Sequence, residues 1–538
     1  MPKTRTLHEA LAEALPQGLD FLFYHLSTPP EPCSPVFSPP PQQAETQTFC
    51  ERHLLLLSLP CSDTVNGEVL AFALEVLVFI TDGFNTIFVS KADSTGYLHL
   101  SSLPPGAPSV LKTICTTLLS LLVFEYSQCG RVLLCLFARS QNQYLFPGSV
   151  DSAGKHVLDD RKLIKWWCTT LNPLVRHDES PYVINAKEMP SSTNTCKAHI
   201  IVPGCDKAEI RAFLPLSARL ERDSKWSIGY PPDLIRSDDG VPLRCLIPRF
   251  PDDPKARFLD DLDAEVPEEE LRANGNWRAV QSLDQFWEMM SYRQECSAGR
   301  LVGFLWLIYT PKGPAVCQTG ERLASKVISP AQCSSAGSTA TETVVQKTEK
   351  TAVPEGKDER LVNAEAKLSH GGVGTILPET ANQSSQGSCW REHASSAPKP
   401  HRVPWPKECR GKLISTATYE YLMSHLVQKG EFSTLSKAVA STATWTAEIS
   451  SLSLPGSLSQ TPGTLTDAFC GTMDLPIRVT GRKVLSASSP STEGFHQTKQ
   501  QNNDQQGPNV GKVNVLTGVR RGKKRKLDGD AGTVTGQD

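Results

Sequence analysis

The sequence predicts a mixed α/β fold in which helices surround a central β-sheet. Short segments rich in β-branched, leucine and aromatic residues are separated by polar turns such as SDTVNGE and TDGFN, a pattern typical of strands. Longer apolar segments flank these strands and are typical of helices. Strands grouped between helices favour a buried sheet covered by helices.

The predicted elements follow one another along the first 311 residues. A helix at residues 7–15 ends at Pro16, and a proline-rich loop covers residues 29–41. The predicted strands are 54–59, 69–80, 86–90, 132–138, 199–202, 211–214 and 245–247. The predicted helices are 111–125, 161–171 and 283–295, and the apolar run 301–308 closes the domain. Asp159 and Asp160 favour the N-terminus of the helix that follows them.

Apolar residues are unevenly distributed along the 538 residues. They make up 39% of the chain and are dense up to Pro311, so we expect one large domain at residues 1–311. Residues 312–400 are rich in small, polar and charged residues, and we expect a disordered insert there. Residues 401–449 should form a helical segment that docks onto the large domain, because it is too short to hold its own core. Residues 450–538 should be a disordered tail with a basic end.

Charge and cysteine usage limit the class of protein. The formal net charge is −2, so the whole chain has no strong attraction for polyanions, and we expect no sequence-specific binding of nucleic acid. Basic residues cluster near the C-terminus: Arg520, Arg521, Lys523, Lys524, Arg525 and Lys526. Such a cluster is typical of nuclear import or of an acidic partner, although a solvating tail would have the same composition. The sixteen cysteines contain no CxxC pair, which favours a reduced compartment and no metal site.

Neither a membrane span nor a common catalytic signature is found. The longest apolar run, residues 69–80, is too short to cross a bilayer and contains Glu75, so we expect no membrane association. The patterns GxxxxGK[ST], GxSxG and HExxH are absent. Gly372 and Gly374 form the nearest glycine pattern, but they lie in low-complexity sequence.

Four polar and aromatic segments of the large domain are candidates for chemistry. SKADSTGY, residues 90–97, follows a predicted strand and is predicted to be a loop. Such a loop can present its backbone N–H groups to phosphate or amides, although a hairpin turn would have the same composition. FARSQNQYLFP, residues 137–147, places Tyr144 at a strand end where it can line a cleft; a buried tyrosine with a satisfied hydroxyl is the alternative. In KHVLDDRKLIKWW, residues 155–167, at least one of Trp166 and Trp167 should line a pocket or interface, unless both simply pack against another element.

The fourth segment, IPRFPDDPKARFLDDLD at residues 247–263, contains three prolines. These prolines predict a rigid extended loop carrying Asp252 and Asp253. Acidic loops are usually solvated turns. Here basic residues surround the two carboxylates, which favours a carboxylate fixed for catalysis.

Together these segments resemble the Rtt-type fungal histone acetyltransferases, the regulator-of-Ty-transposition family. The resemblance also includes LPQGLDFLFYHLSTPP and QFWEMMSYRQECSAGRLVGF, covers residues 15–310 in order, and extends to the basic end GVRRGKKRKL. It implies a fold similar to the CREB-binding-protein-like acetyltransferases and acetyl-CoA as cosubstrate. It further implies a nuclear enzyme that acetylates lysines of histone H3 on newly synthesised H3–H4, with histone chaperones, in replication-coupled chromatin assembly and the DNA damage response.

The same resemblance implies roles for individual residues. Asp253, Tyr144 and Trp167 match the active-site group, with Asp252 beside them, and Lys255 matches a self-acetylated lysine. The positions that match the cofactor-contacting set are Ala92, Asp93, Ser94, Phe137, His156, Val157, Leu158 and Trp166. The stretch AEVPEEELRANGN, residues 264–276, departs from the family, so substrate contacts there are not implied. The [QR]xxGx[GA] motif of the other large acetyltransferase class is missing, which agrees with a different way of holding CoA.

The implied reaction requires an amine to attack a thioester. A free lysine has a pKa of about 10.4 and is almost entirely protonated at neutral pH. Asp253 either removes the proton, which requires a raised carboxyl pKa, or mainly attracts and orients the ammonium while an apolar tunnel lowers the lysine pKa. We favour the second account, with Tyr144 as proton donor to the leaving thiolate.

Three other functions compete with this one. A catalytically inactive acetyltransferase fold that bridges histones and chaperones is the chief alternative, and the retained Asp93, Tyr144, Trp167 and Asp253 argue against it. An acyltransferase for small molecules fits the long insert and basic tail less well. A nucleic-acid binder is disfavoured by the neutral charge of residues 1–310.

Overall fold

The computed structural model describes residues 6–61, 67–103, 107–176, 195–221, 224–234, 241–293, 300–310, 407, 409–451 and 475–484. All of them belong to one unit, residues 1–485. The expected insert at 312–400, most of the expected tail and its basic end lie outside the described residues.

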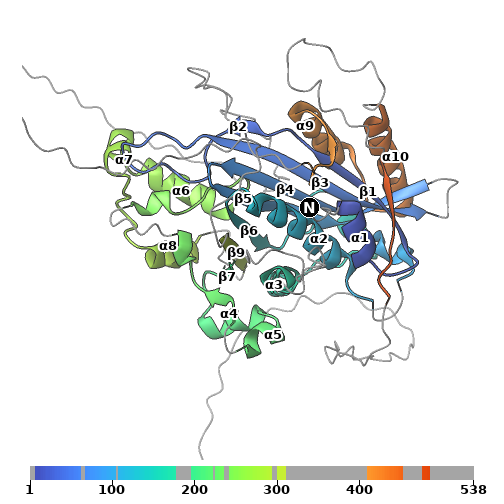
Figure 1. The fold of residues 1–538 in the computed structure, drawn as a ribbon, viewed down its shortest axis with the longest axis horizontal. Coiled ribbons are helices and arrows are strands. Elements are labelled where there is room, and N and C mark those ends of the chain that lie inside the picture. Colours follow the sequence, from blue (N-terminus) through green and yellow to red (C-terminus); the bar gives the residue numbers. More distant parts are fainter. Residues whose placement is uncertain are drawn as a thin grey trace, which may run out of the picture. The chain divides into compact units, whose positions relative to one another are not determined.

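An 11-stranded mixed sheet runs through the described residues, with helices on both of its faces (Figure 1). The strand order is β10-β1-β3-β4-β5-β6-β9-β7-β8, with β11 paired to β1 and β2 to β3. The strands are β1 (Asp20–Ser27), β2 (Glu31–Cys33), β3 (Thr48–Cys61), β4 (Gly67–Thr81), β5 (Phe84–Ser94), β6 (Arg131–Arg139), β7 (Thr195–Ile201), β8 (Trp226–Ile228), β9 (Val302–Thr310), β10 (Lys412–Leu413) and β11 (Ile477–Thr480). The helices are α1 (Leu7–Ala14), α2 (Val110–Ser127), α3 (Asp160–Val175), α4 (Lys207–Phe213), α5 (Leu216–Leu220), α6 (Pro254–Ala264), α7 (Glu268–Asn274), α8 (Leu283–Met290), α9 (Thr416–Ser424) and α10 (Leu435–Ser451). The predicted mixed α/β class is confirmed.

Alternate side chains of the central strands face two different helical layers. In β9, Leu305 and Leu307 pack in the core with α2 and α3, whereas Phe304 and Trp306 pack in the core with α6 and α8. This alternation follows from the period of two in a β-strand. The sheet is therefore buried on both faces, which explains why its central strands are apolar throughout.

The segment after residue 406 completes the sheet and covers part of it. β10 pairs in parallel with β1, and α10 lies along β4, where the Thr442 hydroxyl accepts a hydrogen bond from Leu70 N at 3.0 Å. The Trp445 ring meets Tyr24 edge-on. Figure 1 shows α9 and α10 at the opposite end of the sheet from α6 and α7.

The helix α2 is long and apolar enough to cross a membrane by length and composition, and 78% of it is buried inside the fold. Ser109 caps its N-terminus, and its buried face packs on β5 and β6. The apolar composition of α2 is explained by its burial between the sheet and the neighbouring helices.

Several sequence-based predictions were wrong in detail. Residues 211–214 lie in and just after α4, because Asp206 and Glu209 form a reciprocal capping box that starts a helix there. Residues 245–247 overlap a short 3-10 turn, Leu243–Cys245, and α8 ends at Met290 rather than at residue 295. The strand β1 was not predicted, because its run of apolar residues is buried on both faces and does not alternate. β11 lies within the stretch expected to be a tail. The helix N-terminus at Asp159 is confirmed, since its carboxylate accepts Lys162 N at 2.8 Å.

Candidate active site

Asp253 begins a helix. It is the N-cap of α6, its carboxylate Oδ1 accepts a hydrogen bond from Lys255 N at 2.9 Å, and Pro254 occupies the first helical position. Aspartate at the N-cap and proline just after it are both favoured, because the first N–H groups of a helix lack partners. Asp253 itself has an extended backbone, as expected for the loop, but the loop ends there because Pro254 starts a helix rather than preventing one.

The second oxygen of Asp253 forms an ion pair with the ammonium of Lys255. The pair is buried, with 2% of the Lys255 side chain and none of the Asp253 side chain exposed. The ammonium lies 5.3 Å from the Phe250 ring centre and 5.6 Å from that of Phe304. The two charges compensate each other inside an apolar, aromatic environment, where an unpaired charge would be costly.

Asp252 lies at the surface beside this buried pair. Its backbone φ is 56°, in the left-handed region that non-glycine residues rarely adopt, and 68% of its side chain is exposed. Its carboxylate is 3.1 Å from the ammonium of Lys91 on β5, which is also 3.1 Å from Glu75 on β4. Burial lowers the pKa of Lys91, but the two carboxylates outweigh burial and the net effect is a raised pKa. Lys91 therefore stays charged and holds Asp252.

Asp93 organises the loop that carries Tyr144. The loop segment 90–94 belongs to β5, so these residues are not the free polar loop that the sequence predicted. One carboxylate oxygen of Asp93 accepts the backbone N–H groups of Tyr144 at 2.7 Å, Leu145 at 2.9 Å and Phe146 at 3.3 Å. The other accepts the Lys155 ammonium at 2.9 Å. The carboxylate is fully engaged with protein groups and holds the loop at residues 144–146; a contact between Asp93 and the cofactor stays a prediction.

The hydroxyl of Tyr144 donates a hydrogen bond to the Arg139 carbonyl at 2.6 Å. Burial raises the pKa of Tyr144, an effect that the positive charge of Arg139 reduces. The hydroxyl is therefore protonated at neutral pH, as a proton donor must be.

Trp166 and Trp167 meet edge-on on α3, with ring centres 4.9 Å apart. Trp167 is 5% exposed and packs in the core beneath α3, while Trp166 is half-buried. One turn before Trp167, Ile164 contacts Gly303 on one face of β9. Lys255 lies over Phe304 on the other face. Trp167 thus packs in the core on one face of β9, and Lys255, the partner of Asp253, lies against the other face; that Trp167 and Asp253 meet in one slot stays a prediction.

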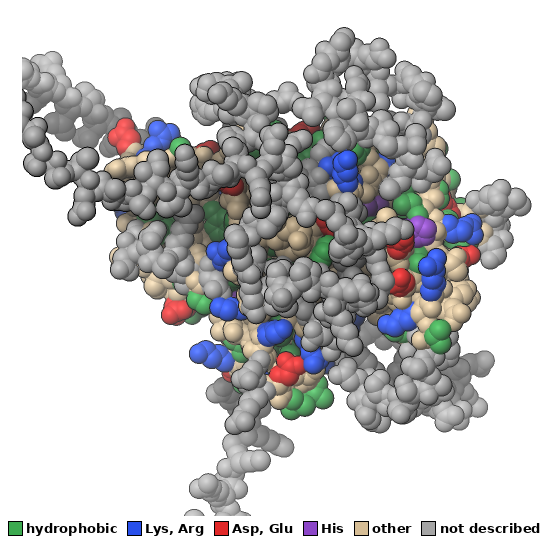
Figure 2. Space-filling view, viewed as in Figure 1, with side chains coloured by type: hydrophobic (Ala, Val, Ile, Leu, Met, Phe, Trp, Pro, Cys, Tyr) green, Lys and Arg blue, Asp and Glu red, His purple; other side chains and the backbone are tan. Residues whose placement is uncertain are grey.

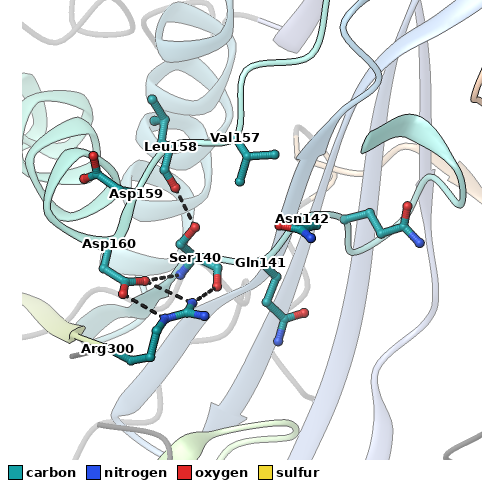
Figure 3. Close-up of a pocket in the computed structure, with 9 residues that line it drawn as sticks. Ser140, Gln141, Asn142, Val157, Leu158, Asp159, Asp160 and Arg300 are labelled. Carbon is teal, nitrogen blue, oxygen red and sulfur yellow. Dashed lines mark hydrogen bonds and ion pairs between the residues drawn. The ribbon is translucent and has the colours of Figure 1, made fainter. Parts of the chain in front are cut away.

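A cavity of about 600 Å³ opens between the end of β6, the start of α3 and Arg300 (Figure 3). It is lined by Ser140, Gln141, Asn142, Gln143, Val157, Leu158, Asp159, Asp160 and Arg300. Of the residues expected to contact the cofactor, it includes Val157 and Leu158. Ala92 and Ser94 lie at the end of β5, Phe137 on β6 packs with Phe88, and His156 is exposed in the connection before α3.

Asp160 holds the walls of this cavity together. Its carboxylate accepts N–H groups from Ser140 and Leu301 and pairs with the Arg300 guanidinium at 2.9 Å. Figure 3 shows Asp160 and Arg300 facing each other beside Ser140. One carboxylate thereby ties the end of β6, the start of β9 and the first turn of α3.

The cavity suits the extended arm of acetyl-CoA. Its volume lies within the usual range for small-molecule sites, about 300–1,000 Å³. Three exposed side-chain amides line it, and amides pair well with the amide groups of a pantetheine chain; Val157, 41% exposed, offers an apolar contact.

In the space-filling view, acidic and basic side chains are interspersed over the visible described surface (Figure 2).

The fold and the family match identify this protein as an acetyltransferase. The histone acetyltransferase KAT11-type domain matches residues 7–131 and 121–448, which is most of the chain. The chain therefore belongs to the KAT11-type histone acetyltransferase family.

Individual relatives agree with this assignment. The chain is 39% identical over 473 residues to histone acetyltransferase rtt109 of Aspergillus flavus, covering 83% of this chain and 82% of that protein. It is 33% identical over 298 residues to histone acetyltransferase rtt109 of Schizosaccharomyces pombe, covering 55% of this chain and 69% of that protein. The crystal structure of Rtt109 from Aspergillus fumigatus superposes with a TM-score of 0.63 at 35% identity, covering 89% of this chain and all of that one.

Sequence reasoning missed three residues near Asp252: Glu75, Lys91 and Tyr419. The signal for Glu75 was present, because a carboxylate within an apolar strand needs a buried partner. Lys91 lay inside a segment that had been singled out. Nothing local pointed to Tyr419, which is 344 residues from Glu75 and hydrogen-bonds to it.

Proposed function

We propose that this acetyltransferase transfers the acetyl group of acetyl-CoA to lysines of histone H3 on newly synthesised H3–H4. Histone chaperones would present the substrate, and the reaction would take place in the nucleus during replication-coupled chromatin assembly and the DNA damage response. Family membership supports a histone substrate. The observation that carries the chemistry is the pair of adjacent carboxylates at the start of α6, Asp253 buried and Asp252 exposed.

The two carboxylates suit different parts of one task. The exposed Asp252 can attract an incoming lysine ammonium from solvent. Asp253 lies deeper, among aromatic rings, where a charged amine is disfavoured unless it is paired. The aromatic surroundings lower the pKa of an amine at this site, whereas a neighbouring carboxylate raises it, so the nitrogen becomes neutral and nucleophilic where the apolar surroundings outweigh the pairing.

Lys255 limits what Asp253 can do while it remains charged. Its ammonium occupies one oxygen of Asp253, and its backbone N–H occupies the other. Acetylation of Lys255 would break the thioester C–S bond and form an amide bond between Nζ and the acetyl carbon. One ammonium proton would go to the CoA thiolate and a second to solvent, leaving a neutral N–H. Asp253 would then lose its resident cation and become available to an acceptor lysine. Self-acetylation is thus proposed as an activating step.

The cofactor site is proposed at the cavity lined by Val157 and Leu158. Acetyl-CoA supplies the activated thioester. The chain supplies the amide residues 141–143 to bind its arm, the Asp160–Arg300 pair to fix the walls, and the protonated Tyr144 hydroxyl as the candidate donor to the leaving thiolate. Trp167, a buried residue of α3, is proposed to belong to the active-site group with Tyr144 and Asp253.

Mass spectrometry of H3–H4 tests this function. The histones are incubated with the protein, acetyl-CoA and a candidate chaperone, and acetylated lysines are mapped. We expect acetylation on H3, and we expect it to fall for Asp253→Asn but not for Asp260→Asn, a matched change at a position on α6 where 66% of the side chain is exposed. Binding of H3–H4 without any acetyl transfer would contradict the proposal and favour a bridging module.

A further inference from the structure

A series of hydrogen bonds and ion pairs connects four polar side chains, from α9 to the surface: Tyr419, Glu75, Lys91 and Asp252. The Tyr419 hydroxyl on α9 donates to Glu75 Oε1 at 3.0 Å. Glu75 Oε2 accepts the Ser90 hydroxyl at 2.7 Å and pairs with the Lys91 ammonium at 3.1 Å. Lys91 also pairs with Asp252 at 3.1 Å. The series runs from the buried interior to the surface: Tyr419 is 3% exposed, whereas 68% of the Asp252 side chain is exposed.

Each link of this series is held from more than one side. Glu75 and Lys91 face each other across β4 and β5, immediately before the register shifts between Glu75 and Val76. Glu75 receives three donors, so its buried carboxylate cannot turn without leaving a donor unpaired. Lys91 therefore projects from a fixed base toward Asp252. The left-handed backbone of Asp252 is uncommon for an aspartate and persists only where its surroundings hold it.

We propose that Tyr419 positions Asp252 through Glu75 and Lys91, so that the exposed carboxylate is set to receive the ammonium of a lysine on a protein substrate. This inference rests on the proposed lysine acetyl transfer and deepens it. Residues 7–310 hold the cavity and the Asp253–Lys255 pair, yet the side chain that fixes the acceptor carboxylate comes from α9. The segment after residue 406 is then part of acceptor recognition.

Tyr419→Phe tests the positioning role by removing only the hydroxyl. One hydrogen bond corresponds to about a three- to tenfold effect, so the KM for H3–H4 should rise by about that factor while the KM for acetyl-CoA stays unchanged. Tyr421→Phe is the matched control, because it lies on the same helix, is 45% exposed and lies beside Glu448. It should leave both KM values at those of the unaltered protein.

Lys91 variants separate positioning from packing. Lys91→Met should raise the KM for H3–H4 at least as much as Tyr419→Phe, whereas Lys91→Arg keeps the charge and should recover most of the affinity. In an Asp252→Asn background, Tyr419→Phe should have no further effect, because residues acting through one another are not additive. Additive losses, or equal changes in both KM values, would overturn the proposal.

The outcome also separates this inference from the proposed function. If the unaltered protein acetylates no H3–H4, the proposed substrate is wrong, and the same variants are measured with poly-lysine as acceptor. A rise in the poly-lysine KM for Tyr419→Phe but not for Tyr421→Phe supports the positioning role. Identical KM values for the two variants overturn it.

Discussion

Asp253 caps the helix that contains Lys255 and holds the ammonium of that same lysine, so one carboxylate both starts α6 and neutralises a buried charge. The two roles use different oxygens of Asp253, and both contacts are made to Lys255, two residues further along the chain. This compact arrangement makes the stability of α6 and the chemistry of the site depend on one side chain.

Removing the buried cation should destabilise the fold. Lys255→Met leaves Asp253 charged and unpaired among aromatic rings, and we expect a loss of about 3–5 kcal/mol in the free energy of unfolding. Urea denaturation measures it. The double variant Asp253→Asn/Lys255→Met should recover part of that loss, and a double variant as unstable as the sum of both single variants would show that the pair does not act as a unit.

Asp93 should control the order of the Tyr144 loop. Asp93→Asn removes the charge that accepts three backbone N–H groups and the Lys155 ammonium, and we expect a loss of about 1.5–3 kcal/mol. Hydrogen exchange should speed up at the amides of residues 144–146. Asp82→Asn, in the exposed turn between β4 and β5, should change neither. Unchanged exchange in Asp93→Asn would remove the proposed role of Asp93.

The cavity walls should determine affinity for acetyl-CoA. Arg300→Ala breaks the pair with Asp160 and loosens the contact between the ends of β6 and β9. Because 54% of the Arg300 side chain is exposed, the effect should be modest, about two- to fivefold in the KM for acetyl-CoA with kcat nearly unchanged. Steady-state kinetics measure it, with Arg278→Ala as a control on an exposed ion pair elsewhere. An unchanged KM would place the cofactor somewhere other than this cavity.

Acid should destabilise the protein through a buried histidine pair. His25 and His53 stack and hydrogen-bond at 3.2 Å, and burial together with His53 holds the pKa of His25 well below its ordinary value of 6.5. Below pH 6.5 the unfolded chain takes up a proton at His25 that the folded chain does not. The free energy of unfolding should therefore fall by up to about 1.4 kcal/mol per pH unit as the pH drops below 6.5, and should not change from this source above it.

The difference between the unaltered protein and His25→Gln isolates this contribution. Denaturation midpoints of the two, measured between pH 5 and pH 8, should converge as the pH falls, because the variant lacks the titrating group. Parallel curves over that range would contradict the assignment.

The sequence predicted elements well where a segment carries its own pattern. The N-terminus of α3 was predicted from two aspartates, and most strands of the sheet centre from their apolar runs. It failed where a distant contact decides the conformation. β1 has no alternation because segments distant in sequence cover both of its faces. Residues 211–213 are a different case, because the capping box of Asp206 and Glu209 that starts α4 is a local signal that was missed.

The candidate site shows the same division. Asp252, Asp253 and Lys255 are close in sequence and remain close in the structure. Trp167 is grouped with Asp253 by resemblance alone, and that grouping stays a prediction: Trp167 packs in the core that contains Leu305, whereas Lys255 lies over Phe304, the neighbouring residue of β9. Tyr419 could not be connected to Glu75 from sequence, because only the folded sheet brings α9 to β4.

The account depends most on Asp253 facing the acceptor amine. Single-turnover acetyl transfer to H3–H4, measured for Asp253→Asn and for the matched Asp260→Asn, tests it most directly. We expect Asp253→Asn to lower the rate by about 10²–10⁴-fold with acetyl-CoA affinity near normal, and Asp260→Asn to leave the rate unchanged. A loss of less than about tenfold for Asp253→Asn would contradict a catalytic role for this carboxylate.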